Sequence, residues 1–416
     1  MLILMIIYCA DHLTLKEKVS GFPLIKILLL FFIYLLFASI IAPAISDEVY
    51  GYQWYKGIFN ENRNLFYLLR VLFLIITYYV FMMMVNNYKN YMVAINALAL
   101  STICYLAILA VLSIYNPDII LWKGMRYYPN RLRLKGFSSE PNSFSAWLYS
   151  VYFLFLTLSF WEIREINVSK KTIRICFGIL SLLLLFFVLS TTAYIAIAIG
   201  MVCFFYNYNK HLKIQVKNSH KKLFTQIKLI GLLGAIIFPM IFFVNYLFPF
   251  FQNIFSKKII SLFMIHDISL TGPRGALFMT NLHMFLKHPV LGVGIGRSAY
   301  FTNVYYPYDK YLADFKPYLA DFDSLNSYAL FFCETGIIGI LFIIYIGIKI
   351  FQYCNFTPLN RNGKIISLYT TSTLVAYLVA MLGSGDIHYQ LYFVLSIVML
   401  VRNFQINKEL DSSKFI

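Results

Sequence analysis

Charged residues are scarce in this sequence. Only 13% of its 416 residues are Asp, Glu, Lys or Arg, whereas a typical soluble domain carries about 25%. Hydrophobic residues make up 60% of the chain, and several of their runs reach the roughly 20 residues that a helix needs to cross a bilayer. The mean hydropathy of +0.71 agrees with this pattern. These features exclude a soluble protein and indicate an all-α integral membrane protein.

The sequence also lacks the cysteine patterns that bind metals or form disulfide frameworks. None of its six cysteines belongs to a CxxC pair, and most lie within or beside apolar runs. They are Cys9, Cys104, Cys176, Cys203, Cys333 and Cys354. We therefore interpret them as small core residues and expect no metal site. The apolar segment 1–10 has neither a basic n-region nor a small-residue cleavage site, so we interpret it as interfacial rather than as a removable signal.

Acidic residues are few, and 35 basic residues against 18 acidic ones give a formal charge of +17. The basic residues lie between apolar runs rather than on one face of a folded domain. Retention of basic loops on the cytoplasmic side accounts for most of them. We expect no binding of nucleic acid.

About ten membrane-spanning helices are predicted within a single polytopic domain, 1–416. The predicted spans are 22–45, 65–85, 91–115, 144–161, 173–189, 191–208, 229–248, 326–351, 366–382 and 388–401. Segment 209–228 holds six lysines and no carboxylate, which places it in the cytoplasm. Both termini then lie in the cytoplasm, while the basic loop 116–143 and the large loop 249–325, expected to be partly helical, lie outside. For a bacterial inner membrane, outside is the periplasm.

The basic loop 116–143 is unusual for an outer segment. It carries five basic residues against two acidic ones, a net charge of +3. The basic residues are Lys123, Arg126, Arg131, Arg133 and Lys135, and the acidic ones are Asp118 and Glu140. Two explanations remain: the loop binds an anionic substrate, or it tolerates this charge and contacts lipid headgroups.

The end of this loop offers the first group of candidate site residues. Arg131 and Arg133 suit phosphate because a planar guanidinium offers paired donors at any working pH. Glu140, Pro141 and Asn142 immediately precede a span. Glu140 favours the helix N-terminus as part of a cap, or it binds a sugar hydroxyl and accepts its proton; both interpretations stay open.

A second group lies near the end of the large outer loop. Arg274 stands between Pro273 and Gly275, and a glycine-rich run follows His288-Pro289 and ends at Arg297. Glycines 292, 294 and 296 are typical of a phosphate-binding loop, or of a tight re-entrant turn that allows close helix contact. Arg297 would be a second phosphate ligand or, as we favour, a headgroup anchor. His288, before a proline, is expected to fix a helix end rather than to transfer protons.

The third group comprises acidic residues and one amide. Asp323 follows Asp314 and Asp321 and precedes Asn326, and Glu334 lies eight residues after Asn326, on the same side of the next span. A carboxylate that faced lipid would be costly, so Glu334 must face protein or water. We expect it to form a hydrogen bond that positions the turn at Gly336.

These motifs together resemble the O-antigen ligase and polymerase superfamily. The likeness rests on Arg274, on His288-Pro-Val-Leu-Gly-Val-Gly-Ile-Gly, and on Asn326-Ser-Tyr followed by Glu334-Thr-Gly-Ile-Ile-Gly. The stretch Arg133-Leu-Lys-Gly-Phe-Ser-Ser-Glu140-Pro-Asn142 resembles Wzy-type O-antigen and capsule polymerases. The ligase branch has a histidine immediately before the asparagine matched by Asn326, where this chain has Leu325.

The resemblance implies a metal-independent membrane glycosyltransferase of GT-C-like fold without cofactors. Its substrates would be oligosaccharides on undecaprenyl diphosphate, with a chain-length regulator and a flippase as partners. Arg133 and Arg274 would hold the diphosphate with Arg131 and Arg297 behind them. Glu140, then Asp323, would activate the acceptor hydroxyl. Asn142, Asn326 and His288 are further candidates for substrate contact, and a flippase or a ligase are the alternative functions.

Overall fold

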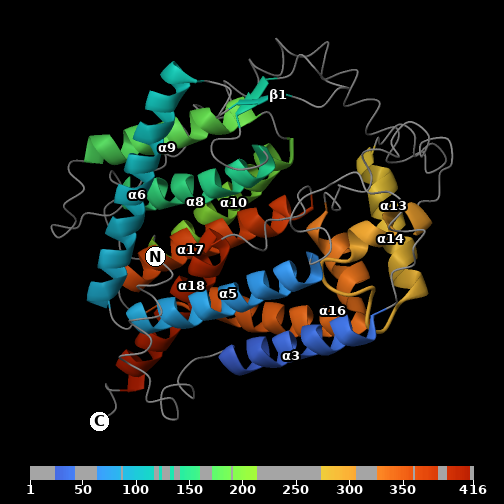
Figure 1. Cartoon of the computed structure of the whole chain (residues 1–416). Helices are drawn as coiled ribbons and strands as arrows, with labels where there is room; N and C mark the ends of the chain where they lie inside the picture. Colours follow the sequence, from blue (N-terminus) through green and yellow to red (C-terminus); the bar gives the residue numbers. More distant parts are fainter. Residues whose placement is uncertain are drawn as a thin grey trace.

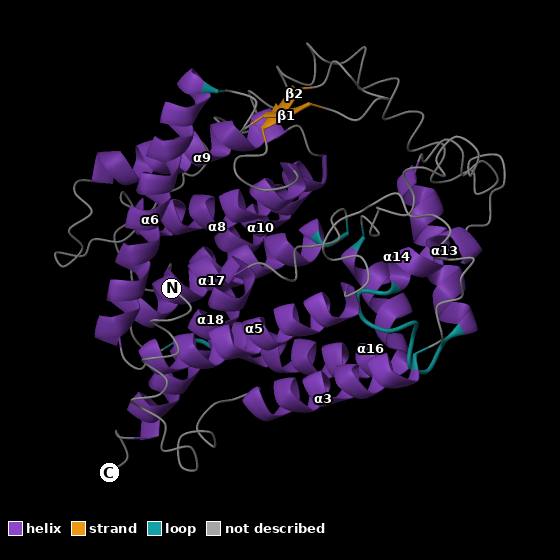
Figure 2. Ribbon diagram, viewed as in Figure 1, coloured by secondary structure: helices purple, strands orange, loops and turns teal. Residues whose placement is uncertain are grey.

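A computed structural model describes residues 24–42, 63–85, 88–116, 121–123, 132–134, 141–159, 171–188, 191–212, 273–305, 326–358, 361–382 and 391–412. These parts of the chain form a bundle of helices with one short pair of strands (Figures 1 and 2). The helices are α3 (Ile25–Ile41), α5 (Arg63–Met84), α6 (Tyr88–Tyr115), α8 (Pro141–Ser159), α9 (Lys171–Val188), α10 (Thr191–Leu212), α13 (Pro273–Lys287), α14 (Ser298–Tyr305), α16 (Ser327–Asn355), α17 (Arg361–Ala380) and α18 (Leu391–Ser412). The strands are β1 (Leu121–Lys123) and β2 (Leu132–Leu134).

Each predicted span within the described residues overlaps one of these helices. The predicted separation of the spans 173–189 and 191–208 is confirmed, because α9 ends at Val188 and α10 begins at Thr191. The span predicted at 229–248 lies outside the described residues. Four helical segments are long and apolar enough to cross a membrane: Arg63–Met84, Val93–Tyr115, Ser327–Asn355 and Asn362–Ala380. The helical membrane class is thereby supported, while the number of spans and the GT-C likeness stay predictions.

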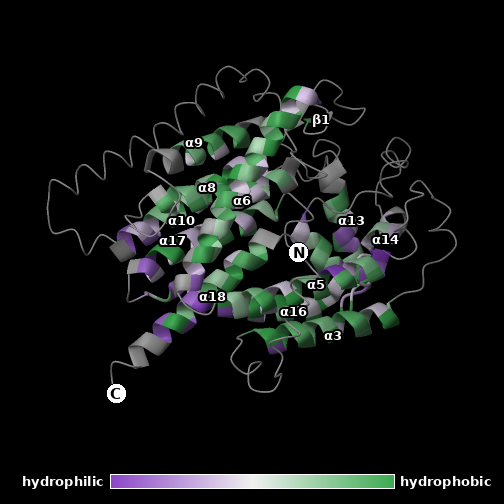
Figure 3. Ribbon diagram, turned by 60° about the vertical axis from the view of Figure 1, so that its left-hand side comes forward, coloured by the Kyte–Doolittle hydropathy of each residue, from purple (hydrophilic) through white to green (hydrophobic). Residues whose placement is uncertain are grey.

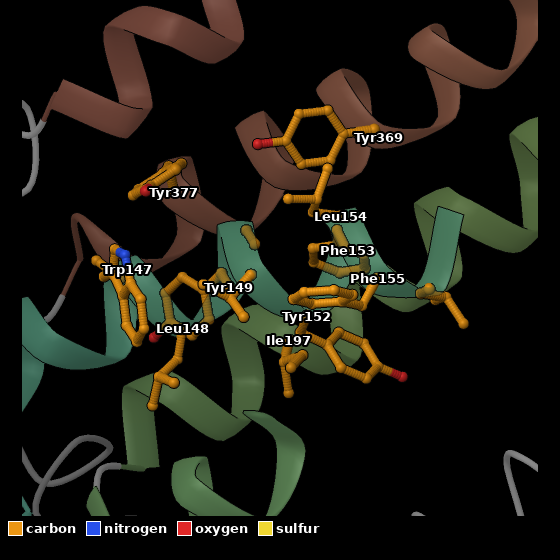
Figure 4. Packing of buried hydrophobic residues seen from close by; sticks show 14 of the residues in the cluster. Trp147, Leu148, Tyr149, Tyr152, Phe153, Leu154, Phe155, Ile197, Tyr369 and Tyr377 are labelled. Carbon is orange, nitrogen blue, oxygen red and sulfur yellow. The ribbon is translucent and has the colours of Figure 1, made fainter. Parts of the chain in front are cut away.

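Helix α8 forms the centre of the largest hydrophobic core. Every residue from Phe144 to Leu158 is buried, as is typical of a helix that is surrounded on all sides. Figure 4 shows large side chains of α8 near Ile197 of α10 and Tyr369 of α17. Phe153 also stacks on Phe204 of α10, and Phe155 stacks on Phe177 of α9. A helix this apolar all round is stable only inside a bundle or a membrane, and α8 is held by its neighbours.

Hydrogen bonds join the same helices within the core. Tyr377 of α17 meets the hydroxyl of Ser150 of α8 at 2.9 Å, and the side-chain amide of Asn207 of α10 donates to Thr371 of α17 at 3.0 Å. Small and hydroxyl-bearing residues let apolar helices pack closely and give them specific contacts where lipid offers no water. These contacts fix α17 between α8 and α10.

Two sets of contacts define the two ends of the bundle. At one end, the amide of Ser327 at the start of α16 donates to the carbonyl of Met381 just after α17. At the other end, the guanidinium of Arg402 donates twice to the carbonyl of Met82 in the last turn of α5, at 2.6 and 2.8 Å. We call the end of the bundle with the Ser327–Met381 contact the site end, and the end with the Arg402–Met82 contact the far end.

Apolar side chains cover much of the outer surface of the bundle. Figure 3 shows α3, α5 and α16 as mostly hydrophobic, with hydrophilic residues gathered on α13, on α14 and towards the end of α18. Exposed residues include Ile40 of α3 at 83% and Phe351 of α16 at 66%. Exposed apolar surface of this extent suits contact with lipid and would be a liability in water.

The hairpin of β1 and β2 is a feature that the sequence analysis did not predict. The strands pair antiparallel, with Trp122 opposite Arg133 and Leu121 opposite Leu134. Residues 132–134 read Leu-Arg-Leu, the alternation of a strand with one apolar face. The hairpin lies within the basic loop 116–143 and sets the backbone position of Arg133 beside α8 and α9.

Candidate functional site

The chain bends sharply after α13, and glycine makes the bend possible. Helix α13 ends at Lys287, two residues before Pro289, which cannot continue a helix. Glycines 292, 294 and 296 follow with φ values of +72°, +93° and +71°. Side chains rarely allow this left-handed backbone, so every second position must be glycine. The re-entrant turn that we gave as one of the two interpretations is confirmed.

This bend docks on a break in α16. Gly336 has φ 63° and ψ −166°, which interrupts the helix. The interruption lets Val293 donate to the carbonyl of Cys333 at 2.8 Å and Gly294 to that of Glu334 at 3.0 Å, while Ile337 donates to the carbonyl of Pro289 at 2.8 Å. We call residues 289–296 together with residues 333–337 the glycine clamp. It joins α13 and α14 to α16 through these backbone hydrogen bonds, next to the end of α3 (Figure 2).

Close packing in the glycine clamp excludes side chains at its glycines. A Cβ atom added at Gly292 would lie 2.6 Å from the amide nitrogen of Thr335, and one at Gly336 would lie 2.7 Å from that of Gly292. Real Cβ atoms essentially never come within 3.0 Å of a backbone atom. The glycine pattern is therefore required by backbone contact.

Glu334, which belongs to the clamp, has a buried side chain, with 4% of the residue exposed. Its Oε1 accepts hydrogen bonds from the Ser298 hydroxyl at 2.7 Å and from the Ser298 amide at 3.4 Å. Ser298 is the first residue of α14, and a carboxylate there also suits the partial positive charge of a helix N-terminus. The prediction that Glu334 faces protein is confirmed, and its carboxylate fixes Ser298, the residue that follows Arg297. A hydrogen bond from Glu334 that positions the turn at Gly336 stays a prediction.

Arg297 lies at the exit of the clamp and is half-buried. Its amide donates to the carbonyl of Gly294 at 3.2 Å, and its own carbonyl accepts from Tyr300 at 3.0 Å. A Cβ at Gly294 would come within 2.9 Å of the Arg297 Cδ and 3.0 Å of the Ala42 Cβ, so this side chain lies beside the end of α3. Its place at the site end is compatible with both the phosphate and the headgroup interpretations.

Residues of α3 and α5 support the clamp from the other side, and the sequence analysis missed them. The Asn64 side-chain amide donates to the carbonyl of Ile295 at 2.8 Å and to the Ser39 hydroxyl at 3.1 Å. The Tyr34 hydroxyl donates to the carbonyl of Thr335. An asparagine at the very start of a predicted span was the one available signal, since polar groups at that depth need partners.

His288 fixes the end of α13, as expected. Its amide donates to the carbonyl of Met284, and its carbonyl accepts from Gly292 at 3.0 Å. The ring Nε2 lies 2.9 Å from the Tyr305 hydroxyl on α14. Burial lowers the pKa of the imidazole below its ordinary value, which favours the neutral form. A role in substrate contact stays a prediction.

Asn326, predicted to bind sugar, is the N-cap of α16. Its Oδ1 accepts from the amides of Tyr328 and Ala329, both at 3.0 Å. Its Nδ2 donates to the carbonyl of Leu382 at 3.2 Å, which ties α16 to the end of α17. A sugar hydroxyl would have to share this amide with the cap, so sugar binding by Asn326 stays a prediction.

The remaining predicted site residues are described only in part. Arg274 is the second residue of α13, Asn142 the second residue of α8, and Arg133 the middle of β2; their backbones are described and their side chains are not. Pro141 opens α8, as predicted for a residue near the first turn. The other predicted residues, Arg131, Glu140 and Asp323, lie outside the described residues.

Among the described residues, the structure contains no group of three or more His, Cys, Asp or Glu side chains that could hold a metal ion. At the site end, the described part of the chain brings together the glycine clamp, Arg297, His288 and the Asn326 cap. The backbone of Arg133 lies apart from them, beside α8 and α9. Arg297 brings a positive charge to the clamp.

Comparison with known proteins found one similarity to a family of membrane proteins. Residues 176–344 match the family model described as O-antigen ligase. The matched segment begins in α9, includes the glycine clamp and Arg297, and ends within α16. It does not include the hairpin, Arg133 or Glu140. A comparison with curated proteins found no match.

Proposed function

We propose that this chain belongs to the O-antigen ligase and polymerase superfamily and that it is a polysaccharide polymerase. It joins oligosaccharide repeat units carried on undecaprenyl diphosphate at the outer face of the bacterial inner membrane. The observation that carries the proposal is Arg297, held at the exit of the glycine clamp within the family-matched segment. A preorganised cation at one end of an apolar bundle suits an anionic headgroup at the membrane surface.

The proposed reaction is a glycosyl transfer. A hydroxyl of one lipid-linked repeat unit attacks the anomeric carbon of a second glycan, and the bond from that carbon to the diphosphate oxygen breaks. The hydroxyl proton leaves to a base, for which Glu140 is the first candidate and Asp323 the second. Negative charge grows on the departing diphosphate, so fixed arginines stabilise the transition state more than the ground state.

The arginines share this work in the proposal. Arg133 and Arg274 hold the leaving diphosphate with Arg131 behind them, and Arg297 binds a lipid-linked diphosphate from the glycine clamp. Asn142, Asn326 and His288 contact the sugar. The net charge of +3 on the basic loop 116–143 supports this division, because an outer loop that keeps such charge against the insertion bias needs it for binding.

A ligase is the second candidate, and the matched family model carries that description. A ligase would transfer a finished glycan to a different acceptor instead of extending it. Leu325 favours the polymerase, since the ligase branch has a histidine there. The likeness of residues 133–142 to polymerases favours the same choice.

The cellular setting follows from the proposed chemistry. Both termini and segment 209–228 lie in the cytoplasm, and the clamp faces the periplasm, where lipid-linked units arrive after translocation. A flippase would supply those units, and a chain-length regulator would act on the polymer. The bilayer is a constant partner through the exposed apolar faces of α3 and α16.

A deletion strain tests the function directly. We expect loss of the gene to leave single repeat units on undecaprenyl diphosphate at the periplasmic face, with no polymer on a gel. Mass spectrometry of extracted lipid-linked glycans measures the repeat number. Loss of a ligase would instead leave long lipid-linked polymer, and loss of a flippase would strand single units on the cytoplasmic side. Either pattern would contradict the polymerase.

Polymerisation should also survive removal of divalent cations. Arginine neutralises the leaving diphosphate in this proposal, so no cation is needed for that task. We expect the purified enzyme in liposomes to make polymer of normal length after EDTA treatment. The control repeats the assay with added Mg²⁺ after EDTA. Activity that EDTA removes and a divalent ion restores would show that a metal acts at the carboxylates near Asp323.

A further inference from the structure

Helix α5 carries two arginines that the proposed reaction does not use. Arg63 opens the helix and Arg70 lies seven residues further on, about 10 Å along the axis. Both lie in a helix apolar enough to cross a membrane. A charged side chain two turns into such a helix, as Arg70 is, is costly in hydrocarbon, and residues of this kind are usually functional. Neither arginine belongs to the family-matched segment.

Arg63 and Arg70 contact one aromatic side chain between them. The Arg63 guanidinium carbon lies 5.4 Å from the centroid of the Tyr67 ring, and that of Arg70 lies 5.9 Å from the same ring. The spacing of four and three residues places all three on one face of α5. The Tyr67 ring therefore holds both positive charges on this face of α5, where they can attract an anionic group.

This face of α5 adjoins the glycine clamp. A Cβ at Gly296 would lie 2.8 Å from the Tyr67 ring and 3.1 Å from the carbonyl of Arg63. The next residue after Gly296 is Arg297. The Asn64 bond to the carbonyl of Ile295 fixes the contact at 2.8 Å. Arg63 and Arg297, which are 234 positions apart in the sequence, therefore belong to one cationic region.

An exposed apolar stripe runs down α5 beside these arginines. Its members are Phe66 at 38%, Leu69 at 55%, Phe73 at 38% and Ile76 at 41% exposed. Arg70 also stacks on the Phe66 ring at 5.9 Å. Arg63 precedes this stripe in α5, and Arg70 lies within its length. Positive charge beside exposed apolar surface matches a lipid that carries an anionic headgroup on a long hydrocarbon chain.

The backbone positions separate this region from Arg274. Arg274 is at the start of α13, thirteen residues before Lys287, which places it about 20 Å along the helix from the clamp end. Arg133 lies beside α8 and α9. A polymerase must hold two lipid-linked diphosphates together, since donor and acceptor carry the same headgroup, and one group of arginines serves only one of them.

We propose that Arg63, Arg70 and Arg297 form a second lipid-diphosphate site, with the hydrocarbon chain along the exposed stripe of α5. The site rests on the proposed function for the identity of its ligand. Arg63 and Arg70 are binding residues that take no part in bond breaking. The Arg133 and Arg274 pair holds the leaving diphosphate, and the α5 site holds the lipid diphosphate of the other substrate.

The test is a binding measurement that needs no turnover. Purified protein in phosphatidylcholine nanodiscs is titrated with undecaprenyl diphosphate, and bound lipid is counted by native mass spectrometry. We expect two molecules on the wild-type chain and one on the Arg63→Gln/Arg70→Gln double variant. The control is Lys349→Gln, which removes another basic residue stacked on an aromatic ring, at 5.7 Å from Tyr345, and should keep both. Two molecules on the double variant would overturn the proposal.

Two further arms complete the test. Arg70→Lys keeps the charge and loses the planar fork. We expect the affinity of its second binding event to weaken about tenfold, as the loss of one charge-assisted hydrogen bond would cause. This single variant replaces the double variant in the test if the double variant does not fold. Nanodiscs of phosphatidylglycerol distinguish the ligand source: if that lipid displaces undecaprenyl diphosphate from the α5 site, the site is a general headgroup anchor and the proposal fails. Polymer made by the wild-type chain reports separately on the proposed function.

Discussion

Replacing Arg133 or Arg274 by alanine is expected to shorten the polymer drastically or abolish it. Each guanidinium is proposed to stabilise charge that develops on the leaving diphosphate. Losing one preorganised donor to a developing anion typically costs about 10²–10³ in rate. At such a rate, repeat units would stay unjoined within a growth cycle. Polymer length on a gel measures the effect, with the membrane level of each variant checked by blot.

The lysine variant separates charge from geometry. Arg274→Lys keeps the positive charge and loses the paired hydrogen bonds, so its polymer should be shorter than wild type but longer than that of Arg274→Ala. Arg126→Ala is the matched control, since Arg126 lies in the same basic loop as Arg133 but further from the motif. Normal polymer from both Arg133→Ala and Arg274→Ala at normal protein levels would remove the proposed mechanism, though not the membrane fold.

Replacing Gly336 by alanine is expected to disrupt the glycine clamp and abolish polymer. The backbone at Gly336, with φ 63° and ψ −166°, is nearly exclusive to glycine, and strain of this kind costs about 1–3 kcal/mol. The added Cβ would also overlap the carbonyl oxygen of Val290. Overpacking against fixed backbone adds a further penalty of about 1–3 kcal/mol. The loop that carries Arg297 would have to leave α16.

Gly347→Ala is the matched control in the same helix. A Cβ at Gly347 would meet nothing within 4 Å, so this variant should keep activity, and its helix should gain about 0.5–1 kcal/mol. Thermal unfolding in detergent measures stability, and labelling of a cysteine placed at Val290 measures release of the loop. Gly336→Ala with wild-type stability, wild-type labelling and normal polymer would contradict the clamp.

Much of the helical layout could be predicted from the sequence, because runs of apolar residues report directly on length and burial. The burial of Glu334 followed from equally local reasoning, because a charge that cannot face lipid must find protein. The glycine pattern left two interpretations, a phosphate-binding loop and a tight turn with close helix contact. The structure shows the tight turn and its contact with α16. Local pattern alone left open what the turn would contact.

Contacts between distant parts of the chain could not be predicted. Asn64 meets Ile295 across 231 positions, and Tyr34 meets Thr335 across 301. Nothing near Tyr34 or Asn64 in the sequence indicates a partner in the large outer loop. Asn326 shows the opposite problem: its position in a family motif suggested sugar, while its nearest partners are the amides of its own helix and the carbonyl of Leu382.

Helix α5 is held at both of its ends. Arg402 binds the carbonyl of Met82 at the far end, and Asn64 binds the carbonyl of Ile295 at the site end. With about 27 Å of helix between residues 64 and 82, α5 has no freedom to slide along its axis without breaking one of the two attachments. The position of Arg70 relative to the glycine clamp is therefore fixed. A lipid headgroup bound there would stay at one height through every round of extension, and the growing glycan would always leave the membrane from the same level.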